Sequence, residues 1–325
     1  MSKLIENPKT YSGRELENIF FRPMLTGPSA LDLGIKVMYN MPVPTTLNFW
    51  RRSGDILQPY GAGWNGSKAA DRYQKSIDMS KVKAEIAYSA SDYFSMVYEL
   101  ITNRADVNMD DLSGTELEAA ETELFRQAIA ESIRATMWLG NTDRENGMLG
   151  TFNGLLKAIH TDRDEMTYTT YTADELSIEG YVEELLRQML ADAPEELRAL
   201  KSEGQLAFFC SSDIYAAYEN SLDSVVLDAA YEAKQAGRVG LSMRGIPVID
   251  LQLGKYAEQT ADLPQSFVIL TDRRNLALAV NTSDFPGTEI RMWYNPDQME
   301  NRQRAVFMAG CDYLLPELVS YAHIE

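Results

Sequence analysis

The chain has 325 residues, of which 45% are hydrophobic and 24% are charged. These fractions are typical of globular proteins and argue against wholesale disorder, and no apolar run approaches the roughly 18 residues that a membrane helix needs. A net charge of −18, from 48 acidic and 30 basic residues, argues against affinity for nucleic acid, because such surfaces neutralise phosphates with Lys and Arg.

A chain of this length exceeds what a single hydrophobic core normally supports, so two lobes are expected. Residues 1–8 carry Glu6 and Asn7 and lack the apolar stretch of a secretory signal, which predicts a protein that stays in the cytosol. Cys210 and Cys311 are flanked by apolar residues. We expect both to be buried, reduced thiols.

Residues 1–50 predict an extended arm, because short apolar stretches alternate with turn formers. Residues 35–41 alternate as a half-buried strand does, and Pro42 and Pro44 then remove the donors that a central strand needs. Large aromatic side chains in such an arm either contact a partner molecule or fold back on their own subunit. The candidate assembly contacts of the arm are Phe20, Phe21 and Arg22.

Residues 54–66 are rich in glycine and residues 81–88 alternate as a strand does, which together predict a long two-stranded projection with a glycine-rich portion. An isolated hairpin is marginal in water, so it needs a neighbouring molecule to lie upon. Its candidate assembly contacts are Tyr60, Trp64, Lys68 and Lys75. Its candidate hinges are Gly54, Gly61, Gly63 and Gly66, because glycine tolerates large backbone changes.

The strongest predicted helix covers residues 116–139. Thr115 and Glu118 form a capping box at its start, and Gly140 suits its C-terminus. An apolar row at four-residue spacing contains Phe125, Ile129, Ile133 and Met137. At 1.5 Å per residue this helix spans about 36 Å, which is typical of a structural spine.

The next segment alternates between helix and strand and predicts an α+β lobe. A helix over residues 177–191 places Ile178, Val182, Leu185, Leu186 and Met189 at helical spacing. Further predicted elements are strands at 206–210, 246–251, 266–270 and 276–280, and a helix at 213–222. Alternation returns at 290–294 and in the tail, 302–322.

No set of residues that could carry catalysis emerges, and no catalytic residue, cofactor or metal is expected. His160 and His323 lack the spacing of metal ligands and are expected to be surface or capped histidines. Asn141, Asp143, Glu145 and Gly147 resemble half of a calcium loop, but Phe152 stands where its last glutamate belongs. A polar turn is the better interpretation. Gly147, Gly150 and Gly154 follow a helix instead of a strand, which favours tight turns over a phosphate loop.

The order of these elements resembles the major capsid protein of tailed bacteriophages, which has the Hong Kong 97 fold. The similar stretches are Ala135-Thr136-Met137-Trp138-Leu139-Gly140-Asn141, Phe152-Asn153-Gly154-Leu155-Leu156, residues 208–215, Met243-Arg244-Gly245-Ile246-Pro247-Val248, residues 289–295 and residues 301–306. The resemblance implies an α+β, Hong Kong 97-like capsid fold with a long spine helix. It also implies an N-terminal arm at 1–50, an extended β-hairpin loop at 51–85, a peripheral domain at 86–150 and 288–325, and an axial domain at 151–287.

By the same resemblance the chain is a structural protein and not an enzyme. It assembles with itself as hexamers and pentamers into the icosahedral head, in the host cytoplasm, and encloses double-stranded DNA without binding it specifically. A portal and a scaffolding protein are the other expected partners. The large N-terminal scaffolding domain of some members is missing, which implies a separate scaffolding protein or a processed precursor. Some members crosslink a loop lysine to a neighbour, and Lys68 and Lys75 are the candidate donors here.

Three alternatives stay open. An encapsulin-like nanocompartment has the same fold but encloses proteins. A cytosolic α+β enzyme is a different class, which a stable monomer with a ligand-responsive melting point would indicate. A phage tail or adaptor protein would form tubes or rings instead of closed shells.

Overall fold

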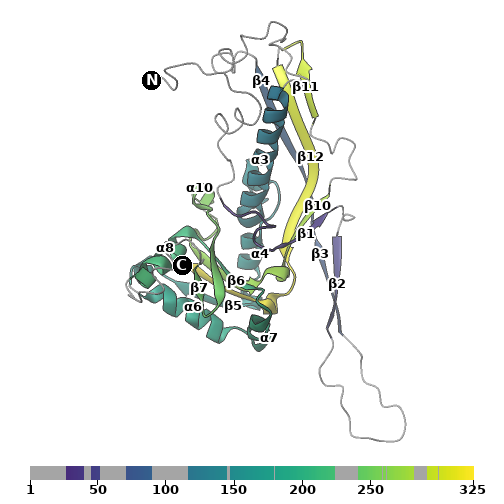
Figure 1. The fold of residues 1–325 in the computed structure, drawn as a ribbon. Helices are drawn as coiled ribbons and strands as arrows, with labels where there is room; N and C mark the ends of the chain where they lie inside the picture. Colours follow the sequence, from purple (N-terminus) through teal and green to yellow (C-terminus); the bar gives the residue numbers. More distant parts are fainter. Residues whose placement is uncertain are drawn as a thin grey trace, which may run out of the picture.

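The computed structural model describes residues 27–39, 45–51, 71–89, 116–144, 147–178, 180–223, 241–257, 259–260, 262–281, 291–298 and 300–325. A long helix stands beside an extended sheet, a rounded lobe lies at one end of the helix, and a narrow hairpin projects from the sheet (Figure 1). The alternation of helix and strand confirms the predicted α+β class.

The predicted spine helix is α3, Glu116–Leu139. Phe125 and Met137 of its apolar row are buried, and its last turn closes with a hydrogen bond of 2.8 Å from the Gly140 amide to the Thr136 carbonyl. Any side chain at Gly140 would collide with the carbonyl oxygen of Phe152. The expected capping residue, Thr115, lies outside the described residues.

A five-stranded sheet runs along α3 (Figure 1). Its central strand is β12, which pairs in antiparallel fashion with β4, β10 and β11, while β1 pairs in parallel with β10. The strands are β1 (Lys36–Tyr39), β4 (Ser80–Ser89), β10 (Leu276–Asn281), β11 (Arg291–Asn295) and β12 (Glu300–Tyr313).

The rounded lobe contains a six-stranded mixed sheet in the order β5-β13-β9-β6-β8-β7. Its strands are β5 (Thr167–Tyr171), β6 (Leu206–Cys210), β7 (Ser242–Met243), β8 (Ile246–Asp250), β9 (Phe267–Asp272) and β13 (Val319–Ile324). Every residue of β6 and β9 is buried, as expected for strands that are covered on both faces.

Two layers of helices cover this sheet. Phe208 of β6 packs among side chains of α6 (Tyr181–Asp192) and α8 (Ser212–Asp223), whereas Phe209 packs among those of α3 and α4 (Leu155–Thr161). The remaining short elements are α5 (Ala173–Leu176), α7 (Glu195–Ala199), α10 (Gly254–Ala257), η1 (Met148–Gly150), η2 (Arg163–Glu165), η3 (Leu200–Glu203), η4 (Arg273–Asn275) and η5 (Pro316–Leu318).

One hydrophobic core serves both sheets. It contains Trp138 of α3, Leu278 of β10, Phe307 of β12 and Tyr321 of β13. Several elements also cross the expected domain boundaries: β4 runs through residues 85 and 86, β10 belongs to the five-stranded sheet, and β13 belongs to the sheet of the lobe. The division into peripheral and axial domains therefore stays a prediction, and the two lobes are packed as one body.

The helix predicted over residues 177–191 is wrong at its start. Helix α6 begins at Tyr181, because Gly180 has a φ of 80° and breaks the helical path after α5. Ile178, which was expected in the apolar row, is 60% exposed. The strand predicted at 81–88 is correct, but it is β4 of the five-stranded sheet and does not belong to the projection.

A buried ion pair fastens α3 to the lobe. The Arg134 guanidinium donates two hydrogen bonds of 2.8 Å to Glu131, one turn earlier on the helix, and one of 2.8 Å to the Leu251 carbonyl. The Tyr256 hydroxyl, from α10, donates to the Glu131 carboxylate at 2.9 Å. Both charged side chains are buried, so each supplies the opposite charge that offsets the cost of burying the other.

We predict that replacing Arg134 by Met destabilises the fold strongly, because it leaves the Glu131 carboxylate buried without a counter-charge. The expected loss is about 3–5 kcal/mol in the free energy of unfolding, measured by urea denaturation of the unassembled subunit. Arg187→Met is the matched control, since Arg187 pairs with Glu183 and Glu184 at the surface and should cost less than about 1 kcal/mol. Equal losses in the two variants would contradict a structural role of the buried pair.

Candidate assembly surfaces

The projecting hairpin is the first candidate surface. Its strands β2 (Thr45–Arg51) and β3 (Asp71–Ile77) pair in antiparallel fashion, with Thr45 opposite Ile77 and Arg51 opposite Asp71. In the described part of the chain they form a sheet of two strands alone, and Figure 1 shows the sheet standing clear of the body. A two-stranded sheet is marginally stable in water. A second molecule that covers the β2–β3 sheet would therefore stabilise it.

The base of this hairpin is anchored to the body by apolar packing. The side chain of Ile77 is fully buried among Met38, Ala277, Ala279 and Leu314. Beside it the chain backbone passes so close to β12 that any side chain at Gly310 would collide with the Asp78 carbonyl oxygen. The projection thus leaves the five-stranded sheet from a fixed point.

Lys75 adds a charged contact two residues before Ile77, on the same face of β3. Its ammonium lies 3.1 Å from an Asp312 carboxylate oxygen and 3.5 Å from the centre of the Tyr313 ring. The Tyr313 hydroxyl in turn donates to Asp162 at 2.5 Å. Lys75, one of the two candidate crosslink donors, is therefore engaged with its own chain. Whether it contacts a neighbouring copy stays a prediction.

Asp312 holds this contact at an energetic cost. Burial raises the pKa of its carboxyl group, and the Lys75 ammonium lowers that pKa only in part. A carboxylate with a net raised pKa is less stable in the folded protein than in water. Packing alone would favour an apolar residue here, so we infer that Asp312 serves to position Lys75 and, through it, the hairpin.

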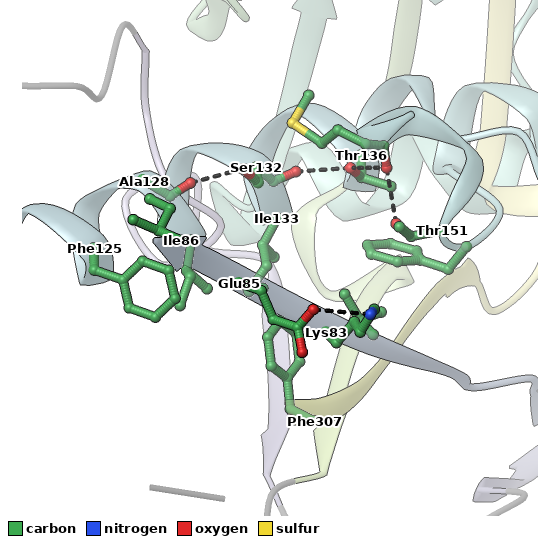
Figure 2. A pocket seen from close by; sticks show the side chains of 15 residues that line it. Lys83, Glu85, Ile86, Phe125, Ala128, Ser132, Ile133, Thr136, Thr151 and Phe307 are labelled. Carbon is green, nitrogen blue, oxygen red and sulfur yellow. Dashed lines mark hydrogen bonds and ion pairs between the residues drawn. The ribbon is translucent and has the colours of Figure 1, made fainter. Parts of the chain in front are cut away.

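A second candidate surface is an apolar groove of about 300 Å³ between α3 and β4 (Figure 2). Phe125 and Ile133 of α3 face Ile86 of β4, and Phe307 of β12 lies beneath them. These walls are apolar because the helix and the strand each direct one face of their side chains toward the gap.

The hydroxyl groups that line the groove each donate a hydrogen bond to a backbone carbonyl. Ser132 donates to the Ala128 carbonyl at 2.8 Å, and Thr136 donates to the Ser132 carbonyl at 2.7 Å. Thr151 likewise donates to the Met148 carbonyl at 2.9 Å. The groove therefore offers an apolar surface with few available donors.

Strand β4 borders the groove and pairs with β12 alone among the described strands. Lys83 and Glu85 are exposed on it and pair with each other at 2.9 Å. Charged side chains on an edge strand oppose unspecific strand addition, whereas Ile86, which is 44% exposed, favours a contact. The charges on β4 therefore oppose unspecific strand pairing, while Ile86 leaves an apolar point for a specific contact.

The calcium-like segment is a polar turn organised by an internal cation. The Lys157 ammonium, from α4, lies 2.6 Å from the Asn141 side-chain oxygen, 2.8 Å from Asp143 and 3.0 Å from Asn153. Glu145 lies outside the described residues. Gly154 begins α4 and approaches the Gly140 backbone closely. The preference for tight turns is confirmed.

The two histidines were predicted to be surface or capped residues, and this is wrong for His323. Its side chain is buried, since β13 lies inside the lobe sheet, and it contacts the His160 ring. In the described residues, no group of three or more His, Cys, Asp or Glu side chains could hold a metal ion. Nor is any helix there long and apolar enough to span a membrane. Cys210 and Cys311 are free and buried, as predicted.

The remaining candidate contacts and hinges lie outside the described residues: Phe20, Phe21, Arg22, Tyr60, Trp64, Lys68, Gly54, Gly61, Gly63 and Gly66. The sequence interpretation missed Asp312 and Tyr313 as the anchor for Lys75. A signal was present, because Asp312 interrupts the otherwise apolar end of β12 with a carboxylate. Its partner could not be found without the pairing of strands far apart in the sequence.

No protein-family model and no curated protein matches this sequence. Among solved structures, a chain from the capsid of a GTA particle is 11% identical with a TM-score of 0.58, and the match covers 99% of this chain and 95% of that one. The capsid protein of Myoviridae phage XM1 is 12% identical with a TM-score of 0.57, covering 98% and 100%. A chain of the satellite phage P4 procapsid is 10% identical with a TM-score of 0.56, covering 92% and 95%. At these identities the likeness shows the fold: this chain has the tailed-phage capsid fold that the order of its elements predicted.

We predict opposite effects for the two partners at the hairpin base. Lys75→Met should lower the free energy of unfolding by about 1–3 kcal/mol, because the partly buried Asp312 loses its counter-charge. Asp312→Asn should leave that free energy unchanged or raise it, because the costly carboxylate is gone. Lys83→Met, at an exposed pair, is the control and should cost less than about 1 kcal/mol.

The same variants differ in pH dependence. Because the pKa of folded Asp312 is above that of an unfolded aspartate, the folded state binds this proton more tightly, and the group favours folding as the pH falls. Lys75→Met should steepen that gain and Asp312→Asn should remove it, as read from urea midpoints between pH 7 and pH 4. Parallel pH profiles for all variants would contradict the assignment.

Proposed function

We propose that this chain is the major capsid protein of a tailed bacteriophage, which assembles with itself into a closed shell. The observation that carries the proposal is the β2–β3 hairpin, a two-stranded sheet that stands off the body and is anchored at its base by Ile77. Such a segment is useful to a protein whose neighbours cover it. This function requires no catalytic residues, because the protein acts by packing beside copies of itself in a shell.

The shell is built from hexamers and pentamers, and each hairpin rests on an adjacent copy. Subunit contacts of this kind are individually weak, because an arm or a loop loses conformational entropy when it docks. The contacts of Tyr60, Trp64, Phe20 and Phe21, and the hinges in the glycine-rich loop, are part of this proposal. The shared core of the body supports it, since a stiff body keeps the direction of each hairpin constant.

The contents of the shell are double-stranded DNA. The net charge of −18 supports this proposal, because phosphates that are repelled from an acidic wall remain free to slide during filling. A scaffolding protein and a portal assist assembly in the host cytoplasm, and the product is the virion capsid. The subunit has two domains: a peripheral domain around α3 and β12, and an axial domain around the six-stranded sheet.

The test is electron microscopy of the protein expressed alone and together with the neighbouring genes of its genome. We expect closed shells of uniform diameter that hold DNA when the packaging machinery is present. Closed shells that hold a co-purifying protein would replace the proposal by a protein nanocompartment. Tubes, rings or a stable monomer in all conditions would refute it.

A further inference from the structure

The only two histidines of the chain meet where the helical layer joins the lobe sheet. His160 lies in the last turn of α4, and His323 lies near the end of β13. Their ring centres are 4.9 Å apart and the rings are perpendicular. Two residues 163 positions apart in sequence therefore form one contact between α4 and the C-terminal strand.

Aromatic rings enclose this contact. Tyr321 stacks on His323 with ring centres 4.9 Å apart, and its hydroxyl lies 3.3 Å from the Nδ1 atom of His160. Tyr168 of β5 stacks on His323 at 6.4 Å. The His323 side chain is 7% exposed, and its Nδ1 atom is buried without a hydrogen-bond partner. This environment suits two neutral imidazoles.

The charged side chain beside the two histidines is a cation, the Arg163 guanidinium. Arg163 of η2 donates to the His160 carbonyl at 2.9 Å, and the other titratable neighbours are the hydroxyls of Tyr168 and Tyr321. The Asp162 carboxylate accepts from Tyr313, and Asp164, Glu165 and Glu325 are exposed. Within the described ranges, neither imidazole has an ion pair with a carboxylate. A proton on either ring would thus meet only positive or neutral groups.

We propose that the His160–His323 contact is a proton-sensitive joint, which holds α4 against β13 when both rings are neutral and loosens when the buried His323 ring is protonated. A charge on that ring has no anion to pair with and cannot be hydrated without separating the layers, whereas His160 is partly exposed to water. The joint does not depend on the proposed function, because it lies within a single subunit.

The direction of the pH effect follows from the environment. Burial, with smaller contributions from His160 and Arg163, lowers the pKa of His323 to about 4. Burial and Arg163 also lower the pKa of His160. Below the unfolded histidine pKa of about 6.5 the unfolded chain takes up protons that the folded chain refuses. The stabilising effect of the joint is therefore complete above pH 6.5 and is lost progressively toward pH 4.

The direct test is an NMR titration of the two imidazoles in the full-length, unassembled protein. We expect both rings to titrate below 6.5, with His323 lower than His160, and His160→Gln should raise the pKa of His323 by removing a neighbouring charge. Two rings that titrate near 6.5, or a His323 pKa that is unchanged in His160→Gln, would overturn the proposal.

The mechanical part needs a second measurement, because carboxylates also titrate in this range. Hydrogen exchange of the β13 amides, corrected for intrinsic rates, should accelerate at least tenfold between pH 7 and pH 4.5 in the wild-type protein. In the double variant His160→Gln/His323→Gln, which stays neutral at both pH values, that acceleration should be lost. Equal acceleration in the two proteins, or none in the wild type, would show that these histidines do not control the joint.

Discussion

A two-stranded sheet has no further strands to share its edges and little means of burying its faces, and this constraint explains the shape of the molecule. Strands β2 and β3 pair with no third strand in the described part of the chain, yet their base is fixed by the burial of Ile77 and by the contact of Lys75 with Asp312. A two-stranded hairpin that is fixed at its base and pairs with no further described strand is suited to a contact with a neighbouring molecule.

The rest of the fold provides the platform for that hairpin. One core packs the C-terminal part of α3 against both sheets, and the buried Glu131–Arg134 pair fixes the helix to the lobe. Asp312 and His323 are two titratable groups that this body holds against the cost of burial. Sites of this kind commonly serve positioning or switching instead of stability.

Much of this architecture could be predicted from local patterns. The row at four-residue spacing from Phe125 and the fully apolar run of β6 identify α3 and a buried strand, because burial on one or both faces imposes those patterns. The start of α6 was missed because the left-handed conformation at Gly180 interrupts an apolar pattern that continues through Ile178. The contacts of Lys75, Asp312 and the histidines join residues far apart in sequence, and a single sequence carries no record of such pairings.

If the hairpin contacts another copy of the chain, as we propose, its backbone amides become protected from hydrogen exchange on assembly. Amides in residues 45–51 and 71–77 would be compared between the dissociated subunit and the assembled particle, with β6 as an internal reference that is buried in both. We expect exchange in the hairpin to slow at least a hundredfold on assembly, while β6 is unchanged. Equal protection of the hairpin in the dissociated subunit and in the particle would show that it has no partner on another copy.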